Sequence, residues 1–312
     1  MNTILVTGGT GLIGMALQNL KKTKNENWIF LSSKDCDLIS LQETETVFKK
    51  YLPNKVIHLA AKVGGLYANE KFKAEFFNDN VSINQNVLSM CFKYNVKKVI
   101  SCLSTCIFPD KIDYPIDETM IHLGPPHSSN YGYAYAKRMI DIINKVYHEQ
   151  YKCNFTSIIP TNIFGENDNF NLENSHVIPG LIHKCYLAQL NNIPFVVKGS
   201  GTPLRQFIYS QDLAKLILWV LEEYKEIDPI ILSTDEKDEI TIKQVVDTII
   251  KAFNYTGKVI WDNNYSDGQY KKTANNKKLI TYLPDFKFTS FDIAIQKSVD
   301  WFKEKYPKIR LS

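Results

Sequence analysis

The stretch that most constrains the fold is the glycine run GGTGLIG at residues 8–14. It follows a short β-branched run, TILVT, and opens a segment with helical periodicity over 13–22. The spacing of Gly8, Gly11 and Gly14 allows a tight turn, a close approach of backbone to a phosphate, and packing of the helix on the strand. Phosphates bind at such a helix start because its N–H groups have no partners within the helix. The run therefore predicts a dinucleotide-binding unit, against the alternative of a glycine-rich turn without a ligand.

Apolar runs alternate with helical patterns through the first half of the chain. Strands are expected at 3–7, 27–32, 55–59, 97–103 and 155–159, with helices at 41–52, 82–94 and 132–150 between them. Parallel strands joined by helices are covered on both faces, which explains why these runs are nearly all apolar. The pattern predicts an α/β fold with a doubly wound parallel Rossmann sheet.

The rhythm changes after about residue 165, where polar loops appear. Later elements are a helix near 177–190, a strand at PFVVKG, a strand end and helix returning to the main sheet in QFIYSQDLAKLILWVLEEY, a small mixed region from 229–233, 241–254 and 258–262, and a helix at 291–305. We therefore expect a smaller mixed α/β C-terminal substrate domain. The predicted division assigns 1–165, joined by about 205–228, to the cofactor-binding Rossmann domain, and 166–204 with 229–312 to the substrate domain.

Composition limits the class of protein. The 312 residues are 44% hydrophobic and 22% charged, which indicates a folded globular chain. The net charge of +4 is too small to favour a nucleic-acid partner. No apolar run reaches the ~18 residues of a membrane span, and no secretory leader is visible. The six cysteines show no CxxC spacing, so we expect no metal site and no disulfides, in a reduced, cytoplasmic protein.

The residues after the second expected strand favour one dinucleotide. NAD-binding chains usually place a carboxylate there to hold the ribose hydroxyls. This chain reads LSSKDCDL, so Ser33 and Lys34 come first and Asp35 comes late. Hydroxyl and ammonium groups suit a 2′-phosphate better than a carboxylate does, which favours NADP, with Asp37 and Leu38 near the adenine. The alternative for Lys34 is a solvated loop charge.

Three residues form a pattern typical of hydride transfer. Tyr133 and Lys137 are spaced YxxxK and fall on one helix face. The lysine charge is expected to lower the pKa of the phenol, which then exchanges a proton with a carbonyl oxygen while hydride is transferred at the carbon. Ser104, at the end of the fourth expected strand, is placed to hydrogen-bond the same oxygen. Tyr135 lies two residues from Lys137 and would face elsewhere; the alternative for the pattern is an ordinary amphipathic helix.

Cys106 and His176 suggest a second proton-transfer task. Cys106 lies two residues after Ser104, and His176 lies in the run NSHVIPG. Thiol and imidazole groups exchange protons near neutral pH, whereas a plain reductase needs no such pair. A base that removes a proton beside a ketone, with an acid that returns one to the opposite face, inverts that carbon. The alternatives are a small buried apolar side chain for Cys106 and a hydrogen-bonded loop residue for His176.

These motifs resemble the extended short-chain dehydrogenase/reductase family. The shared segments are GGTGLIG (8–14), HLAA (58–61), the strand-end Ser104, YAYAK (133–137) and PTNIFG (160–165). Further segments are similar to the branch that epimerises and reduces GDP-4-keto-6-deoxy-D-mannose: VGGLYANE (63–70), CLSTCIFPDKIDYPIDETMI (102–121), PTNIFGENDNFN (160–171), SHVIPGLIHK (175–184), GSGTPLRQFIYSQDLA (199–214) and SDGQYKKTANNKKL (266–279). The resemblance spans the chain and implies a bifunctional epimerase-reductase that forms GDP-L-fucose with NADPH.

The resemblance also implies roles for single residues. Cys106 is expected to be the epimerisation base and His176 the acid, acting at C3 and C5 beside the C4 ketone. Tyr133 is expected to protonate the C4 oxygen, Lys137 to tune the phenol and hold the nicotinamide ribose, and Ser104 to orient the ketone.

Two wider sets of ligand contacts follow. Cofactor contacts are expected from Gly8, Gly9, Thr10, Gly11, Leu12, Ile13, Gly14, Ser33, Lys34, Asp37, Leu38, Ala60, Leu103, Lys137, Pro160, Asn162, Ile163 and His176. Contacts with the GDP-sugar are expected from Lys184, Lys198, Arg205 and Asp267. Bidentate arginine suits a diphosphate, while the alternative for Lys184 is a surface helix charge. Some relatives have a basic residue and a tryptophan where this chain has Thr10 and Lys198.

A homodimer is expected from the resemblance alone. The family usually pairs through helices of the Rossmann domain, here those near 82–94 and 132–150. Composition does not indicate a dimer, because an apolar helix face is more often part of the core.

Three other functions compete with the epimerase-reductase interpretation. A nucleotide-sugar 4,6-dehydratase would place a carboxylate near Ser104, but Thr105 and Cys106 follow it and the first carboxylate is Asp110. A 4-epimerase recycles bound NAD and needs no cysteine–histidine pair. A non-catalytic NADP(H) sensor on the same fold would not need the tyrosine–lysine pair that this chain has.

Overall fold

The computed structural model describes residues 2–20, 25–265, 267 and 269–311. The chain forms two compact units. The first comprises the residues up to 112 with 117–160 and 213–232, and the second comprises 113–116, 161–212 and the residues from 233 onward. These boundaries reflect packing within the chain. The division expected from the sequence assigned ligand roles to each part, and it stays a prediction.

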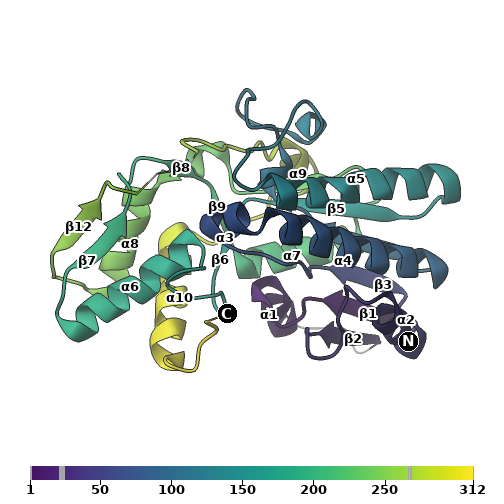
Figure 1. The fold of residues 1–312 in the computed structure, drawn as a ribbon, viewed down its shortest axis with the longest axis horizontal. Helices are drawn as coiled ribbons and strands as arrows, with labels where there is room; N and C mark the ends of the chain where they lie inside the picture. The colour runs from purple at the N-terminus through teal and green to yellow at the C-terminus, as the bar shows by residue number, and fades with distance from the viewer. Residues whose placement is uncertain (1, 21–24, 266, 268, 312) are drawn as a thin grey trace. The chain divides into compact units, whose positions relative to one another are not determined.

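A six-stranded parallel sheet forms the centre of the first unit (Figure 1). Its strands are β1 (Asn2–Thr7), β2 (Glu26–Leu31), β3 (Lys55–His58), β4 (Lys98–Cys102), β5 (Phe155–Pro160) and β10 (Ile230–Leu232), in the order β10-β5-β4-β3-β1-β2. Each adjacent pair is parallel. Strands β4 and β5 are buried along their whole length because helices cover both faces. The predicted doubly wound Rossmann sheet is confirmed.

Helices connect these strands: α1 (Leu12–Asn19), α2 (Leu41–Tyr51), α3 (Leu66–Lys71), α4 (Lys73–Lys93), α5 (Tyr131–Tyr151) and α7 (Ser210–Glu222), with short 3-10 helices η1 (Thr105–Ile107) and η2 (Glu118–Met120). Helices α4 and α5 lie side by side (Figure 1). Their close approach requires Gly132, where an added Cβ would lie 2.5 Å from the Lys73 carbonyl oxygen. This contact fixes the first turn of α5, which carries Tyr133.

The register brings the carboxyl ends of the strands to one edge of the sheet. Thr7 pairs with Leu31 and with His58, and His58 pairs with Ser101. The chain continues from β1 to β2 on one side and to β3 and β4 on the other, so the topology switches direction beside β1. In open α/β sheets, ligands bind beyond the carboxyl ends at such a switch point. The loops after β1 to β4 are therefore where a site is expected.

Three local expectations differ from the structure. The run 229–233 was expected in the small C-terminal region, but Ile230–Leu232 pairs with β5, because three fully buried apolar residues complete that side of the main sheet. The helix expected at 82–94 begins at Lys73, since its mixed composition gives only a weak apolar pattern. The helix expected at 13–22 ends at Asn19, and its last two predicted residues, Lys21 and Lys22, lie outside the described residues.

The second unit is mixed α/β, as predicted. Its described strands form three short ladders: β6 (Asn162–Phe164) with β9 (Phe207–Tyr209), β7 (Phe195–Lys198) with β12 (Val259–Asp262), and β8 (Leu204–Arg205) with β11 (Ile240–Thr241). Its helices are α6 (Val177–Asn191), α8 (Ile242–Phe253), α9 (Lys277–Tyr282) and α10 (Phe291–Lys305), with the 3-10 helix η3 (Glu236–Asp238). Aliphatic and aromatic residues of α6, α8 and α10 form one core with the ladders.

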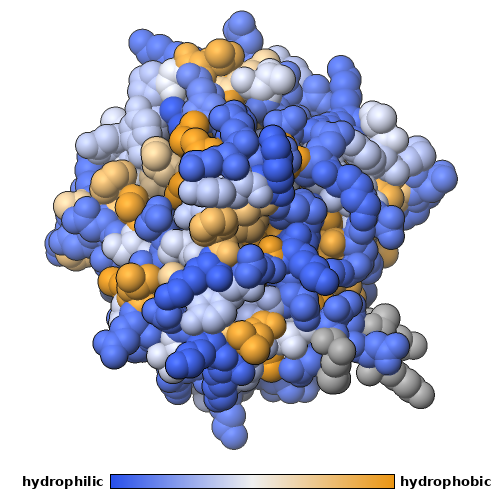
Figure 2. Space-filling view, turned by 90° about the vertical axis from the view of Figure 1, so that its right-hand side faces the viewer, coloured by the Kyte–Doolittle hydropathy of each residue, from blue (hydrophilic) through white to orange (hydrophobic). Residues whose placement is uncertain are grey.

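One face of the molecule can be followed in a space-filling view (Figure 2). Figure 2 views the side on which α2, β1 and the ends of α4 and α5 lie, and shows hydrophilic surface broken by separate apolar groups. None of the described helices is long and apolar enough to span a bilayer. Within the same ranges, no group of three or more His, Cys, Asp or Glu residues could hold a metal ion.

Candidate active site

Three glycines of the run 8–14 leave no room for a Cβ atom. Gly8 has a φ of +69°, and a Cβ there would lie 2.9 Å from Ala60 N. A Cβ on Gly9 would lie 2.6 Å from Phe30 Cβ, and one on Gly14 would lie 2.4 Å from the Gly9 carbonyl oxygen. The loop therefore approaches a ligand with bare backbone, which a dinucleotide requires.

The start of α1 presents its N–H groups without competition from a capping side chain. Gly11 is the N-cap, and no described side chain caps this helix. Gln18 Nε2 donates to the Gly9 carbonyl oxygen at 2.8 Å and so holds the loop against the helix. The first turn contains no acidic residue. Uncapped N–H groups and the helix dipole together fit the pyrophosphate of a dinucleotide.

Alanine at position 14 is expected to disrupt this loop. The methyl group would collide with the carbonyl oxygens of Gly8 and Gly9, which are fixed backbone atoms. We expect NADPH affinity to fall at least about tenfold, or about 1.4 kcal/mol, in a fluorescence titration. Gly124→Ala is the control, since its Cβ would lie 3.4 Å from Pro109 Cβ. Equal affinities in the two variants would contradict the assignment of the loop.

In the loop after β2, the Asp35 carboxylate is hydrogen-bonded by Ser32 of the same loop. Asp35 Oδ2 accepts hydrogen bonds from Ser32 N at 2.7 Å and from Ser32 Oγ at 2.6 Å, and these bonds lower the pKa of the Asp35 carboxyl. Ser33 and Lys34 are exposed in the same turn. The exposed hydroxyl and ammonium groups suit a 2′-phosphate.

A buried series of hydrogen bonds links the end of β1 to α5. Thr7 Oγ1 contacts His58 Nδ1 at 2.8 Å, and His58 Nε2 contacts Asn84 Oδ1 at 3.1 Å. Asn84 Nδ2 donates to the Ala136 carbonyl oxygen at 3.2 Å. Burial lowers the pKa of His58 to about 3, so the ring is neutral. The sequence analysis missed this series of hydrogen bonds, although the histidine in HLAA was a signal for it.

Ser104 and Cys106 lie in one tight turn after β4. Ser104 has extended backbone, with φ −157° and ψ 152°, and caps η1. Its Oγ accepts a hydrogen bond from Cys106 N at 3.4 Å, which leaves the hydroxyl hydrogen able to be donated to a ligand oxygen. The Cys106 side chain is buried, at 8% exposed.

Helix α5 brings Tyr133 and Lys137 to the same place. Lys137 is buried, and its Nζ donates to the Cys102 carbonyl oxygen at 2.8 Å while lying 6.0 Å from the Tyr133 ring centroid. Charge on Cys106 acts on both Tyr133 and Lys137. Four predicted residues of the first unit, Ser104 included, are thus neighbours.

Burial governs protonation in this pair. It raises the pKa of Tyr133 well above its usual value, with a further contribution from Cys106. It also lowers the pKa of Lys137. The expected lowering of the phenol pKa was therefore wrong, because desolvation of the phenolate raises this pKa. A phenol that stays protonated is suited to giving its proton to a developing alkoxide.

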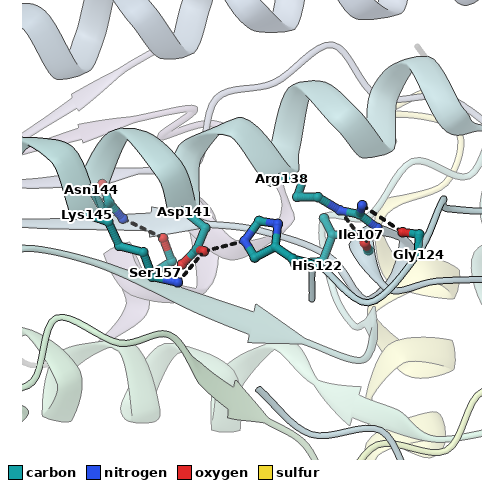
Figure 3. Close-up of polar contacts among 8 residues, drawn as sticks. All are labelled: Ile107, His122, Gly124, Arg138, Asp141, Asn144, Lys145 and Ser157. Atoms are coloured by element: carbon teal, nitrogen blue, oxygen red, sulfur yellow. Dashed lines mark hydrogen bonds and ion pairs between the residues drawn. The ribbon is translucent and has the colours of Figure 1, made fainter. Parts of the chain in front are cut away.

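Two charged residues of α5, Arg138 and Asp141, bind the segment that precedes the helix (Figure 3). Asp141 Oδ2 contacts His122 Nε2 at 2.8 Å and Lys145 Nζ at 2.9 Å. Arg138 donates to two backbone carbonyls. The sequence analysis missed both residues, although their i, i+3 spacing beside Lys137 indicated a shared helix face.

His176 lies in the second unit, as the N-cap of α6. Its backbone is extended, its carbonyl oxygen accepts from Gly180 N at 3.1 Å, and its side chain is exposed. Surrounding protein atoms nevertheless lower the pKa of its imidazole by desolvation. A lowered pKa makes the imidazolium a stronger acid but reduces its population at neutral pH.

The pKa of Lys184 in the second unit is affected by a second lysine, Lys198. Lys184 is half-buried in α6, and its pKa is lowered by burial and then by the charge of Lys198. Lys198 ends β7, and its Nζ lies 4.1 Å from the Tyr265 ring centroid. Like charges held close together are costly unless an anion offsets them, which is the chemistry of a diphosphate site.

Arg205 and Asp267 are engaged with backbone in the structure. Arg205 Nη1 donates to the Leu204 carbonyl oxygen at 2.7 Å, and Nη2 donates to that of Gln269 at 2.6 Å. Asp267 accepts from Ser200 N at 2.8 Å and from Ser200 Oγ at 2.7 Å. Both side chains thus shape the loops around 200 and 269. The neighbouring Ser266 and Gly268 of the predicted SDGQ segment lie outside the described residues.

The other predicted cofactor contacts lie near strand ends, in the glycine run with the first turn of α1, or in the loop after β2. Ala60 N donates to Thr7 Oγ1 at 3.2 Å, and Asn162 Nδ2 donates to the Gln206 carbonyl oxygen at 2.9 Å. Of the remainder, Leu103 and Pro160 are buried, Leu12, Ile13, Leu38 and Ile163 are half-buried, and Thr10 and Asp37 are exposed.

Comparison with known proteins shows the family to which the sequence belongs. The model of the NAD dependent epimerase/dehydratase family matches residues 4–232. A GDP-L-fucose synthase of Dictyostelium discoideum is 56% identical over 311 residues, which cover 99% of this chain and 97% of the relative. A probable GDP-L-fucose synthase of Drosophila melanogaster is 52% identical, covering 99% of this chain and all of the relative.

A solved structure agrees with these sequences. A GDP-L-fucose synthetase from Naegleria fowleri bound to NADP has a TM-score of 0.95 and 52% identity to this chain, covering 99% of this chain and 95% of its own. The family resemblance expected from the motifs is confirmed. The chain therefore belongs to the NAD dependent epimerase/dehydratase family and, within it, to the GDP-L-fucose synthase family.

Proposed function

We propose that this chain converts GDP-4-keto-6-deoxy-D-mannose to GDP-L-fucose, by epimerisation at C3 and C5 followed by NADPH-dependent reduction at C4. The observation that carries the proposal is the turn after β4, which places Cys106 where its charge acts on both Tyr133 and Lys137. It gives one carbonyl position a proton donor for reduction and a thiol for work at the adjacent carbons. The identity to GDP-L-fucose synthases supports the choice of substrate.

Epimerisation begins with loss of the proton at C3 or C5. The C4 ketone acidifies both C–H bonds, because the electron pair left behind spreads onto the C4 oxygen. The hydroxyls of Ser104 and Tyr133 stabilise that oxygen by donating hydrogen bonds. The Cys106 thiolate takes the proton and becomes a thiol, and the His176 imidazolium returns a proton to the opposite face and becomes neutral. The configuration of that carbon is then inverted.

Reduction uses the same oxygen. NADPH, when bound, supplies the hydride to C4. Tyr133 gives its phenolic proton to the C4 oxygen and becomes a phenolate, which the positive charge of Lys137 stabilises. Because burial raises the pKa of Tyr133, the phenol is fully protonated before the step.

The cofactor proposal rests on the first unit. The glycine loop and the uncapped start of α1 would hold the pyrophosphate, and Ser33 and Lys34 would hold the 2′-phosphate. Lys137 has two further N–H groups besides the one given to Cys102, and these suit the nicotinamide ribose hydroxyls. The Naegleria fowleri relative was solved with NADP, which supports this assignment.

The substrate proposal rests on the second unit. Lys184 and Lys198 would offset the diphosphate charge. Arg205 would reach the sugar or diphosphate by exchanging a backbone partner for a ligand oxygen, and Asp267 would contact the nucleotide end.

The proposal is tested by incubating the protein with NADPH and GDP-4-keto-6-deoxy-D-mannose and identifying the product sugar by chromatography. Loss of NADPH with formation of GDP-L-fucose is the expected result. Loss of NADPH with an unepimerised product, GDP-rhamnose, would contradict the roles of Cys106 and His176. Bound but unconsumed NADPH would favour another nucleotide-sugar epimerase or dehydratase, or an NADP(H) sensor.

We also propose that two copies pair through α4 and α5. Met139, Ile142 and Val146 of α5 are 44%, 37% and 49% exposed, and their spacing puts them on one helix face. Phe77 and Phe92 of the adjacent α4 are 40% and 37% exposed. A run of exposed apolar side chains over two packed helices favours an interface with a second copy.

A charge on this face is expected to separate the copies. Val146→Glu would bury a carboxylate without a partner in the interface, at a cost of several kcal/mol. We expect the wild type to behave as a dimer in size-exclusion chromatography with light scattering, and the variant as a monomer. Ile293→Glu on α10 is the control, because Ile293 is 53% exposed and lies outside the proposed face. A monomeric wild type, or a dimeric Val146→Glu variant, would rule out this pairing.

A cytoplasmic location is proposed on chemical grounds. All six cysteines are unbridged in the structure, and five of them are buried. A cysteine that must act as a thiolate base requires reducing surroundings. Cell fractionation with an antibody to the chain tests this.

A further inference from the structure

We propose that Arg138 is a positioning residue for Cys106: its guanidinium ties the Cys106 turn to α5, and its charge favours the thiolate form of the thiol. The inference rests on the proposed role of Cys106 as a base. It concerns a residue that touches neither ligand in the mechanism above, and it explains how a buried cysteine is kept both in place and ionisable.

The guanidinium of Arg138 ties the Cys106 turn to α5 by hydrogen bonds. Arg138 Nε donates to the Ile107 carbonyl oxygen at 2.9 Å, and Nη2 donates to the same oxygen. Nη1 donates to the Gly124 carbonyl oxygen at 2.9 Å. Figure 3 shows the side chain running from α5 to both carbonyls. Ile107 follows Cys106 directly. The Arg138 guanidinium therefore binds the turn that carries the thiol and attaches it to the helix that carries Tyr133.

The charge of the buried Arg138 side chain interacts with Cys106. Arg138 is 7% exposed, and its guanidinium carbon lies 5.2 Å from the Tyr135 ring centroid. Among the residues that the structure describes, no carboxylate lies within ion-pair distance of it. Burial lowers the pKa of Arg138, and negative charge on Tyr135 and Cys106 acts in the opposite direction. The interaction is mutual, so a buried cation without a carboxylate partner stabilises the nearby thiolate.

The other charged and titratable groups around the turn do not replace Arg138. From α5, Lys137 also acts on Cys106, but its Nζ is bound to the Cys102 carbonyl oxygen and faces Tyr133. From the segment before α5, His122 is bound to Asp141. His127 contacts Ser129 and faces Asp110 at 3.9 Å, and the His127 and Asp110 side chains are 42% and 39% exposed.

The hydrogen bonds of Arg138 and its charge can be separated by substitution. Arg138→Met keeps the apolar stem of the side chain but removes both the guanidinium hydrogen bonds and the charge. Arg138→Lys keeps the charge but offers no planar fork to two carbonyls. Circular dichroism melting shows whether each variant is folded, and the reductase assay with the already epimerised 4-keto sugar shows whether Tyr133 and Lys137 still work.

The first readout requires no substrate. The rate of Cys106 alkylation by iodoacetamide is followed against pH, with fragment-ion mass spectrometry separating Cys106 from Cys102 on their shared peptide. We expect the midpoint for Cys106 to rise by about one pH unit in Arg138→Met and by less in Arg138→Lys. An unchanged midpoint in Arg138→Met would overturn the charge argument, whether or not the chain is a GDP-L-fucose synthase.

The second readout tests catalysis. We expect solvent deuterium exchange at C3 and C5 to fall about tenfold or more in Arg138→Met, with reduction of the epimerised ketone nearly unchanged. Arg138→Lys should regain part of the exchange, and its optimum should stay at lower pH than that of Arg138→Met. Equal losses of exchange and reduction would mean a merely structural role and would overturn the inference. Absence of exchange in the wild type would instead reject the proposed function.

Discussion

Replacing Tyr133 by phenylalanine is expected to lower kcat for the reduction by roughly 10²- to 10⁴-fold, while deuterium exchange at C3 and C5 continues. The ring and its packing near Lys137 are kept, so the change removes only the phenolic hydroxyl. Exchange is slowed less than reduction, because Cys106 and His176 carry the protons at these carbons and Ser104 still donates a hydrogen bond to the C4 oxygen. Stopped-flow measurement of NADPH oxidation, with nuclear magnetic resonance of the residual ketone, separates the two effects.

Tyr135→Phe is the matched control for this experiment. Tyr135 lies two residues further along α5. Its ring packs edge-to-face with Tyr131, and the Arg138 guanidinium lies over it. The substitution preserves both ring contacts, so reduction should remain close to the wild-type rate. A Tyr133→Phe variant that reduces the ketone as fast as Tyr135→Phe would show that another group protonates the C4 oxygen.

Replacing Cys106 by serine is expected to have the opposite pattern. A hydroxyl is much less acidic than a thiol, so exchange at C3 and C5 should fall by roughly 10²- to 10⁴-fold. NADPH affinity should not change, because the substitution lies outside the glycine loop and the loop after β2. The variant should still reduce the ketone that has already been epimerised, since Tyr133, Lys137 and Ser104 remain.

Cys153→Ser is the control for the cysteine substitution. Cys153 is half-buried just after α5, outside the turn that follows β4, and its replacement should leave both reactions unaffected. If Cys106→Ser exchanged deuterium at the rate of Cys153→Ser, Cys106 would be a small buried side chain and not a base.

The glycine loop and the first five strands were predictable because their signals are local. Gly8 and Gly14 must be glycine for reasons of backbone geometry, and the buried parallel strands are mostly apolar. The strand Ile230–Leu232 was misassigned because three apolar residues do not indicate which sheet they join. That is decided by pairing with Ile158–Pro160, far away in the sequence.

The candidate site was predictable as a set of residue types but not in its electrostatics. The spacing of Tyr133 and Lys137 gives their shared helix face, whereas the direction of the Tyr133 pKa shift depends on burial by the whole fold. Arg138 reads in sequence as one more surface charge on a helix. Its role emerges only because the turn after β4 brings the Ile107 carbonyl to it. The ligand roles of Lys184, Arg205 and Asp267 stay predictions.

The central claim is that one chain carries out two kinds of proton transfer and one hydride transfer on the same ketone. The most direct test is to run the reaction in deuterium oxide with NADPH and to locate the deuterium in the product by nuclear magnetic resonance. The account predicts GDP-L-fucose with deuterium at C3 and C5 and ordinary hydrogen, delivered by NADPH, at C4. A reduced product without deuterium at C3 and C5 would contradict it.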